Sequence, residues 1–214
     1  MAVTVLIGCC GWSYLNEREF AGQIKRKYSA KLQAYVQLFN TVEINSTFYR
    51  LPRLSTAQKW RQEADVLNPK FEFTVKAYQG ITHRHRFAGG SVSLFNQVKE
   101  ICGALRTSII LFQSPASFRP TDASLKAMKS FFSKIDRDNL TCVWEPRGQW
   151  YDNPALIAET CEGAGLSTAS ILFATSRSSL GKRRLPTSVC TALESRAYIS
   201  TISPRKSSAV WPPF

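Results

Sequence analysis

Several common enzyme signatures are missing from this sequence. The patterns G-x-G-x-x-G, G-x-x-x-x-G-K-[ST] and G-x-S-x-G do not occur, which disfavours the dinucleotide-binding, P-loop and α/β-hydrolase classes. The six cysteines contain no C-x-x-C pair, so neither a zinc site nor a disulfide framework is indicated. H-E-x-x-H is also missing, and we assign no metal to the protein on sequence grounds.

Long apolar runs are missing as well. No run reaches the roughly 18 residues that a membrane helix needs, and the chain does not start with a basic segment followed by an apolar one. With 214 residues, 44% apolar and 20% charged, the composition is that of a soluble globular protein with one main domain. We therefore expect a cytoplasmic protein without a membrane partner.

Acidic residues are scarce toward the C-terminus. The whole chain has a formal charge of +13, and residues 166–214 contain seven lysines and arginines against a single acid, Glu194. An excess of basic residues is typical of nucleic-acid binding, because lysine and arginine neutralise phosphates. In this alternative, the basic loop Arg84 to Arg86 and the basic tail contact phosphates, while Trp12 or Tyr14 stacks on bases.

What the sequence does contain is an alternation of short β-rich runs with segments of helical period, which indicates βαβ units and a parallel sheet. The helical segments start near Ser29, Ser55, Asp122 or Ser124, and Asn153. About six strands are expected, at Val3 to Gly8, Thr41 to Ile44, Phe71 to Val75, Ser108 to Phe112, Thr141 to Trp144, and Ser167 to Leu172.

Polar residues follow the second and third of these strands. Glu43 and Asn45 are two positions apart, so an extended strand directs both to one face, while Val42 and Ile44 face the helices. Lys76 ends the next strand and can bind an anion or pair with Glu43. In a parallel barrel the site lies at the carboxyl ends of the strands, which makes Glu43 a candidate acid or base and Asn45 a candidate ligand contact. Glu43 and Lys76 forming a purely structural ion pair is the alternative.

Three stretches together resemble the signature of the DUF72 family, also called YecE-like or UPF0759. They are Ile7-Gly8-Cys9-Cys10-Gly11-Trp12-Ser13-Tyr14, Thr41 to Arg50, and Phe71 to Ala77. The resemblance implies a TIM-type barrel, in a family whose activity is not settled. Through its matching motifs it places His83, Gln113, Glu145 and Arg147 in the same pocket as Glu43 and Lys76. We expect catalytic roles for Glu43, Lys76, His83 and Glu145, and substrate contacts for Trp12, Tyr14, Asn45, Gln113 and Arg147. A buried, structural Trp12 is the alternative for that residue.

The matching motifs run through five strand ends and stop near Gly165. Later strand ends of the family, with a Tyr-x-Arg-x-His-Gly-like segment and an asparagine-rich strand, are not found, and a full barrel takes about 250 residues. We therefore expect a partial barrel at residues 1–165 and an irregular, basic, Ser/Thr-rich tail at 166–214. That tail is either a natural disordered extension or an out-of-frame or otherwise divergent terminus.

The leading hypothesis is an acid/base enzyme for a small anionic or polyol-like substrate, because two carboxylates combine with cationic and amide groups. A divalent metal on Glu43, Glu145 and His83 is the weaker alternative. Nucleic-acid binding and an inactive, truncated product are the other two hypotheses. The sequence predicts a small-molecule ligand, names no cofactor, and leaves the oligomeric state open.

Overall fold

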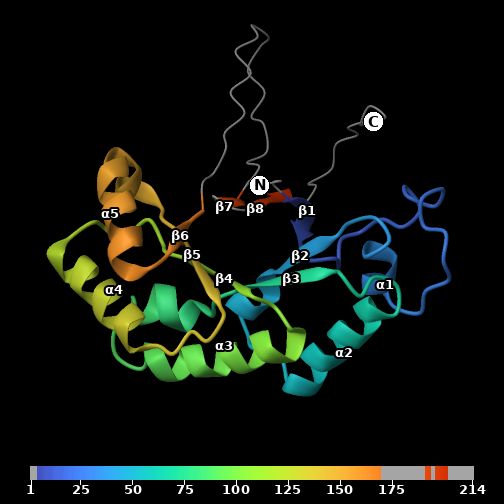
Figure 1. Cartoon of the computed structure of the whole chain (residues 1–214), viewed down its shortest axis with the longest axis horizontal. Coiled ribbons are helices and arrows are strands. Elements are labelled where there is room, and N and C mark those ends of the chain that lie inside the picture. The colour runs from blue at the N-terminus through green and yellow to red at the C-terminus, as the bar shows by residue number, and fades with distance from the viewer. Residues whose placement is uncertain (1–3, 170–190, 194–195, 202–214) are drawn as a thin grey trace, which may run out of the picture.

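The computed structural model describes residues 4–169, 191–193 and 196–201. In this part of the chain an α/β fold places strands and helices in alternation, as in a partial TIM barrel (Figure 1). The strands form one sheet in the order β6-β5-β4-β3-β2-β1-β8-β7. Consecutive strands from β1 to β6 are neighbours and run parallel, as the expected βαβ units require.

All six expected strands are present, each within two residues of its predicted start. They are β1 (Thr4–Cys10), β2 (Thr41–Ile44), β3 (Glu72–Lys76), β4 (Ile109–Gln113), β5 (Thr141–Glu145) and β6 (Ser167–Thr168). The helices are α1 (Lys31–Tyr35), α2 (Leu54–Asp65), α3 (Ser91–Leu105), α4 (Asp122–Lys134) and α5 (Pro154–Ala164). Three short turns of helix follow β2, β3 and β5, namely η1 (Asn45–Phe48), η2 (Gly80–Arg84) and η3 (Gly148–Asp152).

Helix starts follow the capping chemistry of the sequence in some cases and not in others. Asn153 accepts a hydrogen bond from the Leu156 amide, 3.1 Å away, ahead of the proline at the first position of α5. Ser29 does not cap α1, because its hydroxyl donates to the side chain of Gln33 and Ala30 takes the capping position.

The two faces of the sheet bury separate apolar clusters. The larger cluster lies between the sheet and the helices and contains Val42, Ile44 and Phe73. The smaller one lies on the inner face and consists of Ile109, Leu111, Val143 and Ala169. Leu111 and Val143 are register partners two residues before Gln113 and Glu145, so the inner apolar cluster forms the floor beneath the polar strand ends.

Two further strands lie in the segment that we expected to be irregular. β8 (Arg196–Thr201) pairs in parallel with β1, and β7 (Thr191–Leu193) pairs antiparallel with β8. The sequence pattern indicated neither strand. The segment of β8 shows no clear alternation of apolar and polar residues, and β8 is defined by its backbone pairing with β1. The rest of the expected tail, residues 170–190, 194–195 and 202–214, lies outside the described residues, as does the end of the predicted sixth strand.

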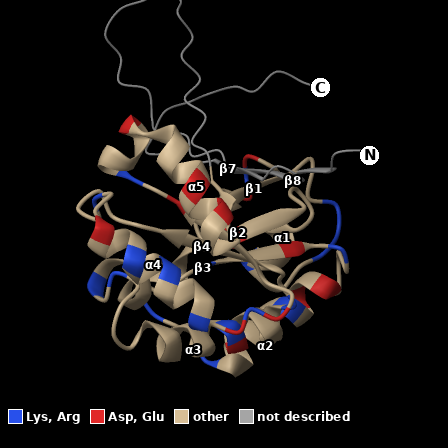
Figure 2. Ribbon diagram, turned by 60° about the vertical axis from the view of Figure 1, so that its left-hand side comes forward, with Lys and Arg blue, Asp and Glu red and all other residues tan. Residues whose placement is uncertain are grey.

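None of the helices in the described residues is both long and apolar enough to cross a membrane. The cytoplasmic location stays a prediction. Figure 2 shows lysine, arginine and acidic positions interspersed over the outer helices. The nucleic-acid alternative also stays a prediction, with Arg84, the last residue of η2, and Arg86 in the following loop both exposed.

Candidate functional site

The polar residues of five neighbouring strands meet at the carboxyl edge of the sheet. Register pairs Cys10 of β1 with Glu43 of β2, and Gln113 of β4 with Glu145 of β5. Side chains alternate between the two faces of a strand, so paired residues in a parallel sheet face the same way. We call this edge of the sheet the mouth. It brings together residues that are distant in the sequence, such as Cys10 and Glu145, which lie 135 positions apart.

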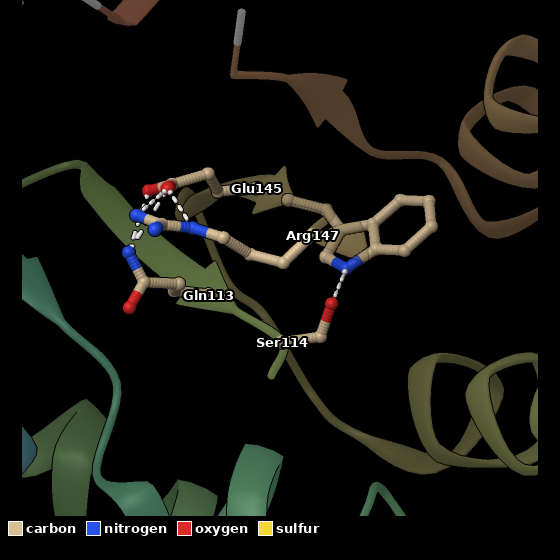
Figure 3. Close-up of polar contacts among 5 residues, drawn as sticks. Gln113, Ser114, Glu145 and Arg147 are labelled. Atoms are coloured by element: carbon tan, nitrogen blue, oxygen red, sulfur yellow. Dashed lines mark hydrogen bonds and ion pairs between the residues drawn. The ribbon is translucent and has the colours of Figure 1, made fainter. Parts of the chain in front are cut away.

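Glu145 is the most tightly held residue of the mouth (Figure 3). Its carboxylate is 1% exposed and accepts hydrogen bonds from Gln113 Nε2 at 2.9 and 3.0 Å. Gln113 contacts both carboxylate oxygens of Glu145. Arg147 donates two hydrogen bonds to one of them, Oε1, from Nε at 2.9 Å and from Nη2 at 2.5 Å. Because a buried carboxylate is costly unless it is paired, these contacts offset the cost of burying Glu145, and they fix the orientation of Arg147.

The strand ends beneath this pair are locked by two tryptophans. Trp144 donates from Nε1 to the hydroxyl of Ser114 at 3.2 Å, as Figure 3 shows, and its ring meets Trp150 edge-on at 4.7 Å. Gly148 has a φ of +68°, and a Cβ there would lie 2.9 Å from the carbonyl oxygen of Ala116. The chain can therefore turn sharply after Arg147 only with glycine at this position.

Glu43 is almost equally buried, at 4% exposed, but its surroundings differ. Burial raises the pKa of Glu43, and the negative charge of Glu145 raises it further, while the positive charge of Lys76 and a hydrogen bond with Cys10 oppose that shift. Desolvation is the largest of these effects. Glu43 is thus the carboxyl group of the mouth that most readily takes up a proton.

Lys76 and His83 border the carboxylates from β3 and η2. The Lys76 ammonium lies over the ring of Phe48, 5.0 Å from its centre, and His83 meets the same ring edge-on at 4.8 Å. The hydroxyl of Thr47, shared between the carbonyl oxygens of Ile44 at 2.6 Å and Lys76 at 2.7 Å, ties the two strand ends together. Partial burial lowers the pKa of His83, and the positive charges of Lys76 and Arg147 lower it further.

Asn45 does not lie in a strand, although its pairing with Glu43 on one face was expected from strand geometry. β2 ends at Ile44, and Asn45 begins the 3-10 turn η1, so the rule that alternate residues share a face does not extend from Glu43 to Asn45. Its Oδ1 atom is buried and has no hydrogen-bond partner among the described residues. A buried amide oxygen without a partner is costly, and it is available to accept a hydrogen bond from a ligand.

Two of the residues expected to contact substrate do not join the cluster. Trp12 packs edge-on against Trp60 of α2 at 5.2 Å and belongs to the periphery of the helix-facing core. Tyr14 is 77% exposed. Six of the other seven candidates influence or contact one another directly, namely Glu43, Lys76, His83, Gln113, Glu145 and Arg147. The seventh, Asn45, follows β2 at the start of η1.

The structure adds three residues that sequence reasoning missed. Cys10 forms a hydrogen bond with Glu43. The ring of Phe48 contacts both Lys76 and His83. Tyr151 of η3 lies close enough to Glu145 and Arg147 for their charges to affect its pKa. Burial raises the pKa of Tyr151, and Glu145 raises it further while Arg147 opposes the shift. Cys10 could have been found from the alignment of β1 with β2. Phe48 and Tyr151 lie in short helical turns that strand periodicity does not indicate.

In the described part of the chain, no group of three or more histidine, cysteine, aspartate or glutamate side chains is arranged to hold a metal ion. Arg147 and Gln113 already occupy the carboxylate oxygens of Glu145. His83 Nδ1 is 2.8 Å from the hydroxyl of Thr82. The chemistry that these residues offer directly is therefore proton transfer and the binding of negative charge.

Comparison with known proteins supports this fold. The chain is 26% identical over 167 residues to the UPF0759 protein YunF of Bacillus subtilis (strain 168), covering 73% of this chain and 55% of YunF. Two crystal structures of a DUF72 family protein from Enterococcus faecalis v583 superpose with TM-scores of 0.57 and 0.54 at 17% and 16% identity. These alignments cover 77% and 78% of this chain, and 60% and 62% of the Enterococcus protein.

The chain thus spans little more than half the length of YunF and about three fifths of the solved relative. A sequence model of the family described as "Protein of unknown function DUF72" matches residues 6–205. This match continues past Gly165, where the recognisable motifs stop, and includes both β7 and β8. Because the match covers most of the sequence, from β1 to β8, the chain belongs to the DUF72 family.

Proposed function

We propose that the mouth is the site of an acid/base enzyme acting on a small anionic or polyol-like substrate. The observation that carries this proposal is a pair of buried carboxyl groups in one site with unlike surroundings. Where two carboxyl groups share a site and their environments differ, they can take different roles. Glu43 exchanges protons, and Glu145 holds Arg147 in place at the site.

We assign proton transfer to Glu43 because burial raises its pKa above the ordinary carboxyl value, and a carboxyl group needs a shift in this direction to exchange protons near neutral pH. A carboxyl group in this state can protonate a substrate oxygen or accept a proton from a hydroxyl or an acidic C–H bond. Lys76 is placed to stabilise the negative charge that forms on the substrate, since its charge already acts on Glu43. His83, which is biased toward the neutral form, can donate or accept a hydrogen bond.

Substrate binding falls to Arg147 and Asn45. The Arg147 side chain is 38% exposed although two of its nitrogens hold Glu145, so the guanidinium keeps N–H donors for an anionic group. Asn45 offers its unpaired Oδ1 atom to a substrate hydroxyl. Arg147 thus offers hydrogen-bond donors for an anionic group, and Asn45 offers an acceptor for a hydroxyl group. These two functions match a sugar acid, a sugar phosphate or a polyol as the substrate.

The test uses the purified chain and three probes: gluconate, glucose 6-phosphate and myo-inositol. Thermal unfolding measures binding, and proton NMR of the incubated probe measures turnover. We expect at least one probe to raise the Tm, with Glu43→Gln keeping that shift while turnover falls at least about 100-fold. Asn45→Ala and Arg147→Met reduce the shift itself.

Glu159→Gln, at an exposed position of α5, is the matched control and leaves binding and turnover unchanged. Unchanged turnover in Glu43→Gln would remove Glu43 from the mechanism. If none of the three probes raises the Tm, the proposed substrate classes are wrong. A Tm shift that neither Asn45→Ala nor Arg147→Met reduces would place the ligand elsewhere.

A further inference from the structure

The opposite end of the sheet contains a cavity of about 270 Å³. It lies where α2 and α3 end and where β3 and β4 begin, at the amino ends of these strands, whereas the mouth lies at their carboxyl ends. Its polar lining consists of Arg61, Lys70, Glu72, Arg106, Thr107 and Ser108. None of these residues belongs to the mouth.

Arg61 is the central residue of this cavity, and it is buried to an unusual degree for an arginine. It is 6% exposed, donates from Nη1 to the carbonyl oxygen of Phe71 at 2.7 Å, and lies over the ring of Phe73, 5.0 Å from its centre. Its Nε atom is buried and has no hydrogen-bond partner among the described residues. A buried guanidinium N–H without a hydrogen-bond partner is costly, so Arg61 is less fully paired than its burial requires.

Positive charge is concentrated around the same cavity. Asp65 forms ion pairs with both Arg61, at 2.6 Å, and Arg106, so two guanidinium groups share one carboxylate. Burial lowers the pKa of Arg61, its contact with Asp65 opposes that shift, and the repulsion from Arg106 adds to it. When Lys70, Asp65 and Glu72 are included, three cations face two anions, which leaves an excess of one positive charge.

We propose that this cavity binds a small phosphate-type oxyanion, either inorganic phosphate or the phosphoryl group of a small metabolite. Arg61, Lys70 and Arg106 supply the charge. Arginine is the residue best matched to phosphate oxygens, since its planar N–H donors bind them in pairs. Ser108 is exposed beside these groups and adds a hydroxyl donor.

The volume of the cavity sets the size of the ligand. Sites for drug-sized ligands measure roughly 300 to 1,000 Å³, so a cavity of about 270 Å³ favours a compact anion over a nucleotide. An oxyanion here is attracted by Lys70 and Arg106, and its negative charge reduces the repulsion between Arg61 and Arg106. It also joins the ends of α2 and α3 to the starts of β3 and β4.

Isothermal titration of the chain with sodium phosphate, at an ionic strength held constant with sodium chloride, tests the proposal. We expect saturable binding that is weakened at least about tenfold in the double variant Lys70→Gln/Arg106→Gly. Arg106 has a φ of +53°, a conformation that glycine adopts freely, so this substitution removes the charge without straining the backbone. Circular dichroism of the double variant verifies that it is folded.

Two control variants locate the bound anion. Lys59→Gln removes an exposed charge from the same helix as Arg61 and leaves phosphate binding unchanged. Arg147→Met removes the anion-binding cation of the mouth, so it weakens any phosphate bound there but leaves phosphate bound in the cavity unchanged. Loss of binding in Arg147→Met would place the phosphate at the mouth and overturn the proposal. Unaltered binding in the folded double variant, or no saturable heat from phosphate, would overturn it as well.

A second titration with glycerol 3-phosphate distinguishes the two sources of the anion. Tighter binding than that of inorganic phosphate identifies the phosphoryl group of a metabolite, and equal or weaker binding identifies the free ion. In both cases the binding must be weakened in the double variant. If it is not, glycerol 3-phosphate binds elsewhere and the cavity is not its site.

Discussion

The two carboxyl groups of the mouth, Glu43 and Glu145, are nearly equal in burial but differ in the groups that surround them. Glu145, between β4 and β5, receives four hydrogen-bonding contacts from Gln113 and Arg147. Glu43, between β1 and β3, has Lys76 and Cys10 beside it, yet burial dominates and raises its pKa. Burial alone therefore does not describe the surroundings of a carboxyl group, since two groups that are equally buried can differ in the number and geometry of the donors around them.

The largest expected effect comes from removing the charged partner of Glu145. Arg147→Met keeps the aliphatic stem but leaves the carboxylate with Gln113 alone. Breaking a buried ion pair costs about 3 to 5 kcal/mol, and because Arg147 is partly exposed we expect a loss of about 2 to 3 kcal/mol. Urea denaturation at pH 7 measures it, with Arg119→Met, at an exposed position of the same charge type, as the control.

Gln113→Leu removes the other partner of Glu145, which is uncharged. It deletes two hydrogen bonds to an ionised group, so we expect a loss of about 1.5 kcal/mol in the free energy of unfolding. The same urea titration applies. A loss equal to that of Arg147→Met would show that the amide and the guanidinium support Glu145 equally, and the contrast between charged and neutral donors would fail.

Glu43→Gln should act in the opposite direction, and only in one pH range. Because the pKa of Glu43 is raised in the folded state, the folded protein holds more protons than the unfolded chain above the ordinary carboxyl pKa, and stability falls as the pH rises. The neutral amide avoids this loss. The variant should gain stability relative to the parent as the pH rises above the ordinary carboxyl pKa, by less than Gln113→Leu loses. A difference independent of pH would contradict the raised pKa.

The smallest effect is expected at Phe48, which both Lys76 and His83 contact. Phe48→Leu keeps an apolar side chain but removes the ring face beneath the ammonium group. We expect a loss of about 0.5 to 1 kcal/mol, the size of a cation–π contact at a partly exposed site. Urea denaturation in low and high salt is the measurement. No change at either salt concentration would show that Phe48 only fills space.

Much of the fold could be predicted because the strands are local patterns. Thr41 to Ile44 and Thr141 to Trp144 are β-rich runs bounded by turn and cap residues, and both form strands. β8 could not be predicted in this way, since it is defined by its pairing with β1, which is distant in the sequence. Similarly, Trp12 follows a glycine-rich strand end, as a ligand-stacking residue would, but α2 presents Trp60 to it.

The amino-acid sequence by itself determined which residues stand at the strand ends, and hence that Glu43, Lys76, Gln113, Glu145 and Arg147 share one edge of a parallel sheet. Strand period and βαβ order led to this result for Glu43 and Lys76, and the resemblance to the DUF72 family added Gln113, Glu145 and Arg147. Only the tertiary structure decided that Arg147 and Gln113 converge on Glu145 while burial governs Glu43. It alone decided that Arg61 is buried with an unpaired Nε. The physical reason is that desolvation and hydrogen-bond geometry depend on neighbours from distant segments, and no local pattern records those neighbours.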